Sequence, residues 1–191
     1  MDHYLEILLH PDPEFTANIL MSALFSKLHR GLVNHGSQRI GLSFPDIRPD
    51  STQGSRTLGQ RVRLHGSRGN LHGLMQSGWL QGMRDHCELT GIMAVPDGAK
   101  QRVVCRVQAK SSPERLRRRL MMRKQIDEVA ACESIPDSAA ERLNLPFVTL
   151  SSATTSQRFK LFVEHRPIQD VAVPGIFSAY GLSNTATVPW F

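Results

Sequence analysis

The stretch of sequence that decides the fold covers residues 4–34 and reads YLEILLHPDPEFTANILMSALFSKLHRGLVN. Its first part, Tyr4–His10, is typical of a strand, and the prolines that follow break the chain. From about Glu14 to Asn34 the apolar residues recur at helical spacing and form one stripe, made of Leu20, Met21, Leu24, Phe25, Leu28 and Leu32. The stretch therefore predicts a strand followed by an amphipathic helix.

Four further elements complete a recognisable order. Ile40–Phe44 and Gln60–Gly66 predict two strands, joined by a polar loop over residues 45–59. Asn70–Gln76 predicts a weak helix, and Glu88–Val95 predicts a fourth strand. The order β-α-β-β-α-β is that of the ferredoxin-like (RRM-like) fold, an antiparallel sheet with two helices on one face. This fold carries many functions, so it names none.

A second domain is expected after Pro96-Asp97-Gly98, which would divide the chain into residues 1–97 and 98–191. Val103–Ala109 predicts a strand, and Ser112 and Pro113 are a typical helix start for a helix over about 113–124. Three more short strands are expected at Phe147–Leu150, Arg158–Glu164 and Phe177–Gly181. The predicted fold class is α+β: an N-terminal ferredoxin-like domain and a C-terminal α/β domain that carries an arginine-rich helix.

Positive charge is concentrated in one segment. The chain of 191 residues has a net charge of +6, but residues 100–125 alone carry +9, which leaves −3 for the rest. Such a distribution suits a polyanion, above all a nucleic acid. A basic helix that merely faces solvent is the alternative that charge alone leaves open. The basic residues of the segment are Lys100, Arg102, Arg106, Lys110, Arg115, Arg117, Arg118, Arg119, Arg123 and Lys124.

The arginine-rich helix is predicted to have two functional faces. Leu116 and Leu120 lie together and can anchor the helix on the protein. Arginine suits phosphate because its planar guanidinium pairs two oxygens at once and stays charged. Regular A-form RNA has a major groove too deep and narrow for side chains, but a hairpin end opens it, so a hairpin fits better than a long duplex. The broad basic face holds Arg115, Arg118, Arg119 and Arg123.

Arg106 and Gln108 are a second candidate for nucleic-acid contact. Strand alternation would place both side chains on one face just before the basic helix. Arginine can bond guanine and glutamine can bond adenine, so the pair could read base edges. Two exposed polar residues on an edge strand are the other interpretation.

Composition narrows the class of protein. Apolar residues make up 40% of the chain, enough for an ordinary globular core. The opening residues include acids where a signal peptide needs bases, and no apolar run approaches the roughly 20 residues that span a bilayer. We therefore expect a cytoplasmic protein without a membrane partner. Cys87, Cys105 and Cys132 are widely spaced, which argues against a disulfide framework and a cysteine zinc site.

The residues alone do not decide which side chain would carry out catalysis. None of the eight histidines forms a metal-binding spacing, and neither a nucleophile elbow nor a P-loop is present in the sequence, so we expect no metal and no cofactor. A metal-free ribonuclease needs a base near neutral pKa to take the proton of a ribose 2′-hydroxyl, which is histidine's usual role. All eight stay candidates, and His29 is preferred because it lies at the half-sheltered edge of its helix.

Several motifs together resemble a known family. They include Arg106–Leu120, Leu145–Leu150, and the ending Tyr180–Ser183 with Val188–Phe191. The opening Met1–Leu5 and Ile40–Asp46 extend the similarity over almost the whole chain. These segments resemble the repeat-processing endoribonucleases of type I-F (Csy) CRISPR systems, in the Cas6 superfamily.

The resemblance implies a function and a set of site residues. His29 would be the base acting on the 2′-hydroxyl, Ser152 would constrain the ribose, and Tyr180 would orient the histidine. Arg106 and Gln108 would read base edges at the foot of the repeat hairpin, and Phe159 would stack on its terminal base pair. The family cuts without metal, leaves a 2′,3′-cyclic phosphate and a 5′-hydroxyl, and stays with the crRNA beside the other subunits of the surveillance complex.

The sequence departs from the family pattern at two places. Met122 stands where close relatives carry a further arginine, and the loop over residues 45–59 is longer than its counterparts. Both differences bear on RNA affinity rather than on the reaction.

Taken without the resemblance, Phe159 and Tyr180 would be core aromatics and Ser152 part of a polar loop. The rivals are a hairpin-binding protein that cuts nothing and a regulator of duplex DNA, the second being disfavoured by the absence of helix-turn-helix spacing.

Overall fold

The computed structural model describes residues 1–47, 57–108, 113–136, 143–152 and 156–191, which fall into two units. Unit 1 comprises Met1–Val107 and Leu145–Phe191, and unit 2 comprises Gln108–Asn144. Helices and antiparallel strands both contribute to the described fold, which confirms the predicted α+β class.

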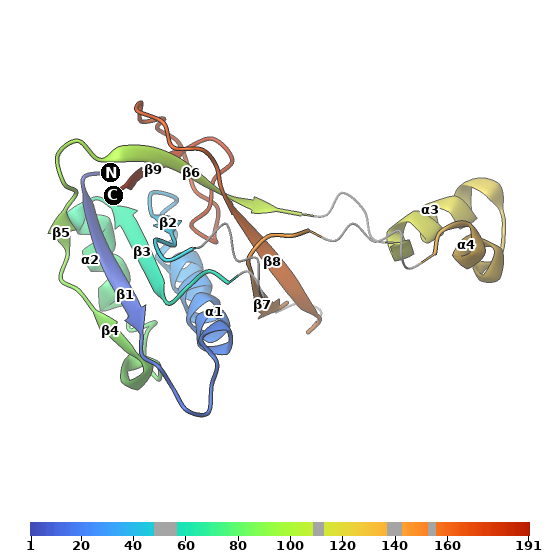
Figure 1. The fold of residues 1–191 in the computed structure, drawn as a ribbon, viewed down its shortest axis with the longest axis horizontal. Helices are drawn as coiled ribbons and strands as arrows, with labels where there is room; N and C mark the ends of the chain where they lie inside the picture. Colours follow the sequence, from blue (N-terminus) through green and yellow to red (C-terminus); the bar gives the residue numbers. More distant parts are fainter. Residues whose placement is uncertain (48–56, 109–112, 137–142, 153–155) are drawn as a thin grey trace. The chain divides into compact units, whose positions relative to one another are not determined.

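The first sheet of unit 1 has the ferredoxin-like topology. Its strands follow the order β2-β3-β1-β4, and every neighbouring pair is antiparallel. Because β3 lies between β1 and β2, the β1-α1-β2 unit is split, as the β-α-β-β-α-β pattern requires. The elements, visible in Figure 1, are β1 (His3–Leu9), α1 (Ala17–His35), β2 (Gly41–Ser43), β3 (Arg61–Gly66), α2 (Arg68–Gln76) and β4 (Cys87–Leu89).

Strand β1 and helix α1 form the centre of the core, as the opening stretch predicts. Leu5, Ile7 and Leu9 alternate along β1 and are buried, as one face of a strand should be. The apolar stripe of α1 is also buried, and Gly36 ends the helix with a left-handed φ of 69°. The helix begins at residue 17 rather than 14, because Asp12 accepts hydrogen bonds from the backbone of Glu14 and Phe15 and holds them in a turn.

The second sheet of unit 1 comes from the later part of the chain. It has the order β7-β8-β6-β9, with β6 (Lys100–Val107), β7 (Phe147–Ser151), β8 (Arg158–His165) and β9 (Thr187–Trp190). Helix α1 packs against β7 as well as β1, and the two sheets share one hydrophobic core. The expected boundary at residues 97 and 98 separates the sheets in sequence, and independent domains on either side of it stay a prediction.

Two strand predictions need correction. The strand expected over Glu88–Val95 is divided into β4 and a short β5 (Met93–Ala94), because Thr90 turns aside to exchange hydrogen bonds with the backbone of Glu6. The strand expected over Phe177–Gly181 is wrong. This segment is a loop that contains a turn, and the last strand of the sheet is β9.

Unit 2 is a pair of helices. Helix α3 (Pro113–Lys124) has the predicted bounds, whereas Ser112, its predicted N-cap, lies outside the described residues. The prediction omits helix α4 (Glu128–Ser134). Asp127 is its N-cap, and the Asp127 Oδ1 accepts a 2.8 Å hydrogen bond from the Ala130 N–H. Among the described helices of both units, none has the length and apolar character needed to cross a membrane.

Candidate functional site

A hollow of about 570 Å³ in unit 1 brings together residues that are far apart in sequence. One wall is the exposed side of α1, and the others are the end of β7, the start of β8 and the loop before β9. We call it the α1–β7 pocket. Four predicted site residues line it: His29, Ser152, Phe159 and Tyr180.

His29 is half-buried on α1 and is held by one backbone atom. Its Nδ1 lies 2.8 Å from the carbonyl oxygen of Ala179. Because a carbonyl oxygen only accepts hydrogen bonds, Nδ1 carries the proton, and the neutral ring keeps the lone pair on Nε2. The imidazole is therefore held in the tautomer in which Nε2 acts as a base.

Tyr180 fixes the plane of the same imidazole. The two rings stack with centroids 4.2 Å apart and planes inclined by 18°. Phe25, one turn earlier on α1, also stacks with Tyr180, at 6.3 Å. A hydrogen bond in the plane and a ring against the face leave the histidine little freedom, which is the preorganisation that catalysis needs.

The loop that supplies Ala179 and Tyr180 is anchored to the first sheet. Gly181 accepts a 2.8 Å hydrogen bond from the Leu42 N–H, and its own N–H donates to Ser178 at 2.8 Å. Gly181 has a φ of 67°, and a Cβ there would collide with the Leu42 side chain. This tight turn, and not an added strand, is what residues 177–181 form.

Arg106, on β6, lies close to two aromatic rings of the pocket wall. Its guanidinium carbon lies 5.7 Å from the Phe159 ring centroid and 5.5 Å from that of Tyr180. Such a cation–π arrangement gathers a positive charge and two aromatic faces in one place. The buried Nε of Arg106 has no hydrogen-bond partner among the described residues.

Ser152 and Gln108 each come directly after the last residue of a strand. Ser152 follows β7 directly, and its N–H donates a 2.9 Å hydrogen bond to the carbonyl oxygen of Gln157, just before β8. Strand β6 ends at Val107, so Gln108 lies beyond it and belongs to unit 2, where it is exposed. Ala109, the predicted end of the strand, is outside the described residues.

The basic face of α3 is exposed in unit 2, as predicted. Leu116 and Leu120 are half-buried, and α3 packs against α4. Arg117 lies off the basic face and donates a 2.8 Å hydrogen bond from Nε to the Ile135 carbonyl, at the end of α4. Met122 is 80% exposed. The exposed arginines are Arg115, Arg118, Arg119 and Arg123.

Two other histidines are poor candidates for a base. His65 is fully buried against Ser43, and burial lowers its pKa well below the usual value. Burial, with a smaller contribution from Arg102, lowers the pKa of His165 to about 3. Within the described ranges, no cluster of three or more histidine, cysteine or acidic side chains could hold a metal.

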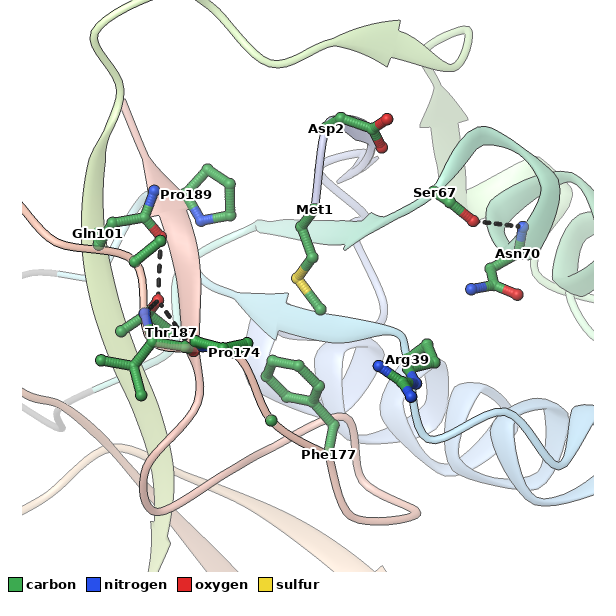
Figure 2. A pocket seen from close by; sticks show the side chains of 13 residues that line it. Met1, Asp2, Arg39, Ser67, Asn70, Gln101, Pro174, Phe177, Thr187 and Pro189 are labelled. Carbon is green, nitrogen blue, oxygen red and sulfur yellow. Dashed lines mark hydrogen bonds between the residues drawn. The ribbon is translucent and has the colours of Figure 1, made fainter.

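A larger hollow, of about 730 Å³, lies elsewhere in unit 1 and holds none of the predicted site residues. Figure 2 shows the Met1 side chain extending into it above Phe177, with Arg39 at one side. In its wall the Thr187 hydroxyl donates a 3.0 Å hydrogen bond to Gln101. Among its described lining residues there is no histidine, no cysteine and no pair of carboxylates, so the larger volume does not mark a catalytic site.

Two features of the structure were not predicted from the sequence: the contact of the Ala179 carbonyl and helix α4. The Ala179 carbonyl is a backbone atom, and no side-chain pattern marks it. Helix α4 did carry a signal, since Asp127 followed by Glu128 is a typical helix start.

The family model and the curated relatives that match this chain point to the same family. Residues 4–191 match the CRISPR-associated protein family Cas_Csy4. The chain is 51% identical to a CRISPR-associated endonuclease Cas6/Csy4 of Pseudomonas aeruginosa (strain UCBPP-PA14) and 46% identical to one of Escherichia coli (strain UTI89 / UPEC), each over the full length of both chains. A solved structure described as "An RAMP protein binding different RNA substrates" covers 98% of this chain and 99% of its own, at 11% identity and a TM-score of 0.33, too weak a likeness to support an argument.

The turn at Gly181 gives a stability prediction. We expect Gly181→Ala to lower the free energy of unfolding by about 2–4 kcal/mol, because the new Cβ meets Leu42 and the left-handed φ becomes strained. Gly36→Ala is the matched control. It has a similar φ of 69° but nothing within 4 Å of its Cβ, so about 1 kcal/mol is expected. Urea denaturation measures both, and equal costs would contradict the anchoring role of the Leu42 contact.

Proposed function

This chain belongs to the CRISPR-associated Cas_Csy4 family, and we propose that it is an endoribonuclease that binds the CRISPR repeat hairpin of precursor crRNA and cuts at the 3′ base of the stem. The full-length relatives, which are named endonucleases, support the enzyme class. The observation that carries the proposal is His29, presented at the wall of a pocket with its Nδ1 bound to a carbonyl.

The proposed reaction is an internal transesterification without a metal. Nε2 of His29 takes the proton of the ribose 2′-hydroxyl, and the 2′-oxygen attacks the adjacent phosphorus. A new 2′-oxygen–phosphorus bond forms while the bond from phosphorus to the 5′-oxygen breaks. The leaving oxygen takes a proton from solvent water, and His29 returns the proton that it removed to solvent. The products are a 2′,3′-cyclic phosphate and a 5′-hydroxyl. Attacker and phosphate belong to one backbone, so positioning supplies much of the rate.

Tyr180 and Ser152 are proposed to position the reacting groups. The Tyr180 ring stacks on the imidazole and, with Ala179, restricts its rotation. Ser152 lies in the wall of the same pocket, where its hydroxyl could hold the ribose that carries the attacking oxygen. Neither residue needs to change charge during the reaction.

Phe159, Arg106 and Gln108 are proposed to recognise the foot of the stem. Phe159 lies in the pocket wall and offers an aromatic face to the terminal base pair. Arg106 lies over that ring, and its planar guanidinium has the bidentate geometry that suits guanine. Gln108, exposed just beyond β6, would pair with the next base edge.

The basic face of α3 is proposed to enter the major groove of the hairpin. Arg115, Arg118, Arg119 and Arg123 would contact phosphates on both sides of that groove, and the exposed Met122 would contribute none. Tight binding through these contacts would retain the cleaved hairpin. The mature crRNA and the other subunits of the type I-F surveillance complex are therefore the partners that we propose.

A hairpin-binding protein that cuts nothing is the second candidate. It would use the same basic helix and would leave His29 as an ordinary residue at the helix edge. The hydrogen bond and ring stack on His29 favour the enzyme, because a merely structural histidine at a pocket wall does not require a defined tautomer.

Replacing His29 separates the two candidates. We expect His29→Ala to slow cleavage of the repeat hairpin by about 10²–10⁴-fold, because the general base is lost. Hairpin affinity should change less than about twofold, because no proposed RNA contact is removed. Single-turnover cleavage and equilibrium binding measure the two effects. His72→Ala, at an exposed position of α2, is the control expected to change neither. Parallel loss of cutting and binding in the His29 variant would contradict its assignment as the base.

Salt dependence tests the phosphate contacts of α3. We expect Arg115→Ala or Arg119→Ala to weaken hairpin binding and to lower the slope of log Kd against log salt by about 0.9, because one fewer counterion is released. Filter binding over a salt series measures both. Arg84→Ala, an exposed arginine of unit 1, is the charge-matched control. A slope unchanged in the α3 variants would remove those arginines from the phosphate contacts.

A further inference from the structure

A second hollow lies next to the α1–β7 pocket on the same helix. It has a volume of about 200 Å³ and is lined by Lys27, Arg30, Gly31, Asn34, Ser77 and Trp79. Arg30 and Asn34 line both hollows. The two hollows therefore adjoin along α1 within unit 1, and together we call them the α1 groove.

The α1 groove is positively charged. Lys27 and Arg30 contribute two cations, and no acidic side chain of the described residues lines either hollow. Outside residues 100–125 the chain has a net charge of −3, so two bases without an acid differ from the rest of the surface. The groove therefore has the sign of charge that attracts phosphate.

Lys27 and Arg30 are both partly ordered. Lys27 donates a 2.8 Å hydrogen bond to the Gln81 carbonyl, which keeps its ammonium at the edge of the groove. Arg30 is exposed, and its Nε donates to the Ser26 carbonyl at 3.3 Å. In the part of the chain that the structure describes, no acceptor is bound to the terminal nitrogens of Arg30. Those two nitrogens have the geometry for a bidentate contact to phosphate.

Trp79 adds a rigid aromatic wall. It is half-buried and packs on Gly31 so closely that a Cβ at Gly31 would lie 2.8 Å from the indole. The absence of a side chain at Gly31 is therefore what lets the indole rest on α1. A fixed aromatic beside basic side chains is the combination that binds single-stranded nucleic acid without strong sequence preference.

We propose that the α1 groove binds the single-stranded RNA that flanks the repeat hairpin next to the cleavage site. This inference rests on the proposed function and extends it. The scissile phosphate must lie at His29, at one end of the groove, and the strand has to continue from there. Arg30 and Lys27 then contact its phosphates, and Trp79 supports a base.

The test uses an RNA that cannot be cut. A 2′-deoxyribose at the nucleotide before the scissile phosphate removes the attacking oxygen, so binding is measured without cleavage. Four RNAs are compared: the bare hairpin, the hairpin with a 5′ flank, with a 3′ flank, and with both. We expect at least one flank to tighten binding of the unchanged protein at least threefold.

Arg30→Gln and Trp79→Leu test the contacts. Each is expected to remove at least half of the affinity gained from the flank, and Arg30→Gln is expected to lower the salt slope for the flanked RNA by about 0.7. Arg68→Gln, at the other end of α2 from Ser77, is the charge-matched control that keeps the full gain. The single-flank RNAs show which side of the hairpin occupies the groove.

Each contrary outcome has a distinct meaning. Equal affinity for bare and flanked hairpins would overturn the inference, as would a flank gain that survives both groove substitutions, and either result would leave the proposed function intact. If the bare hairpin failed to bind the unchanged protein, the proposed function would fall, and the inference with it.

Discussion

The hydrogen bond between His29 and the Ala179 carbonyl depends on contacts between three distant parts of the chain. Helix α1 supplies the imidazole, the loop before β9 supplies the carbonyl, and the Leu42 N–H of β2 holds that loop through Gly181. The core under α1 fixes the first of these, since the helix packs on both β1 and β7. A tautomer is thus set by backbone geometry, and the packing of two sheets around one helix sets that geometry.

The two units divide the work of the proposed enzyme. Unit 1 holds the candidate chemistry, in a pocket lined by His29, Tyr180 and Phe159, with Arg106 over the two aromatic rings. Unit 2 is a short helix pair whose exposed arginines provide charge and whose internal contacts, such as Arg117 to Ile135, keep the pair together.

Apolar spacing and helix-start residues predicted those helices and strands that depend on neighbouring residues in the sequence. The stripe of α1 follows from periodicity, the start of α3 follows from the helix-start signal at Pro113, and the β-α-β-β-α-β order led to the observed topology. The segment 177–181 has strand-like composition but forms a turn, because its backbone pairs with Leu42, far away in sequence. His29 was preferred from its helical edge, whereas Ser152, Phe159 and Tyr180 were named through family resemblance alone, since a strand aromatic or a loop serine has no distinctive local signal. Their catalytic and binding roles stay predictions.

The central claim is that His29 drives a metal-free attack by the 2′-hydroxyl. The most direct test is to incubate the purified protein with end-labelled type I-F repeat hairpin RNA in excess EDTA and to identify the ends of the products. The account predicts one cut at the 3′ base of the stem, with a 2′,3′-cyclic phosphate on one fragment and a 5′-hydroxyl on the other. Cleavage that stops in EDTA and returns with added Mg²⁺, or a product with a 3′-hydroxyl and a 5′-phosphate, would contradict it.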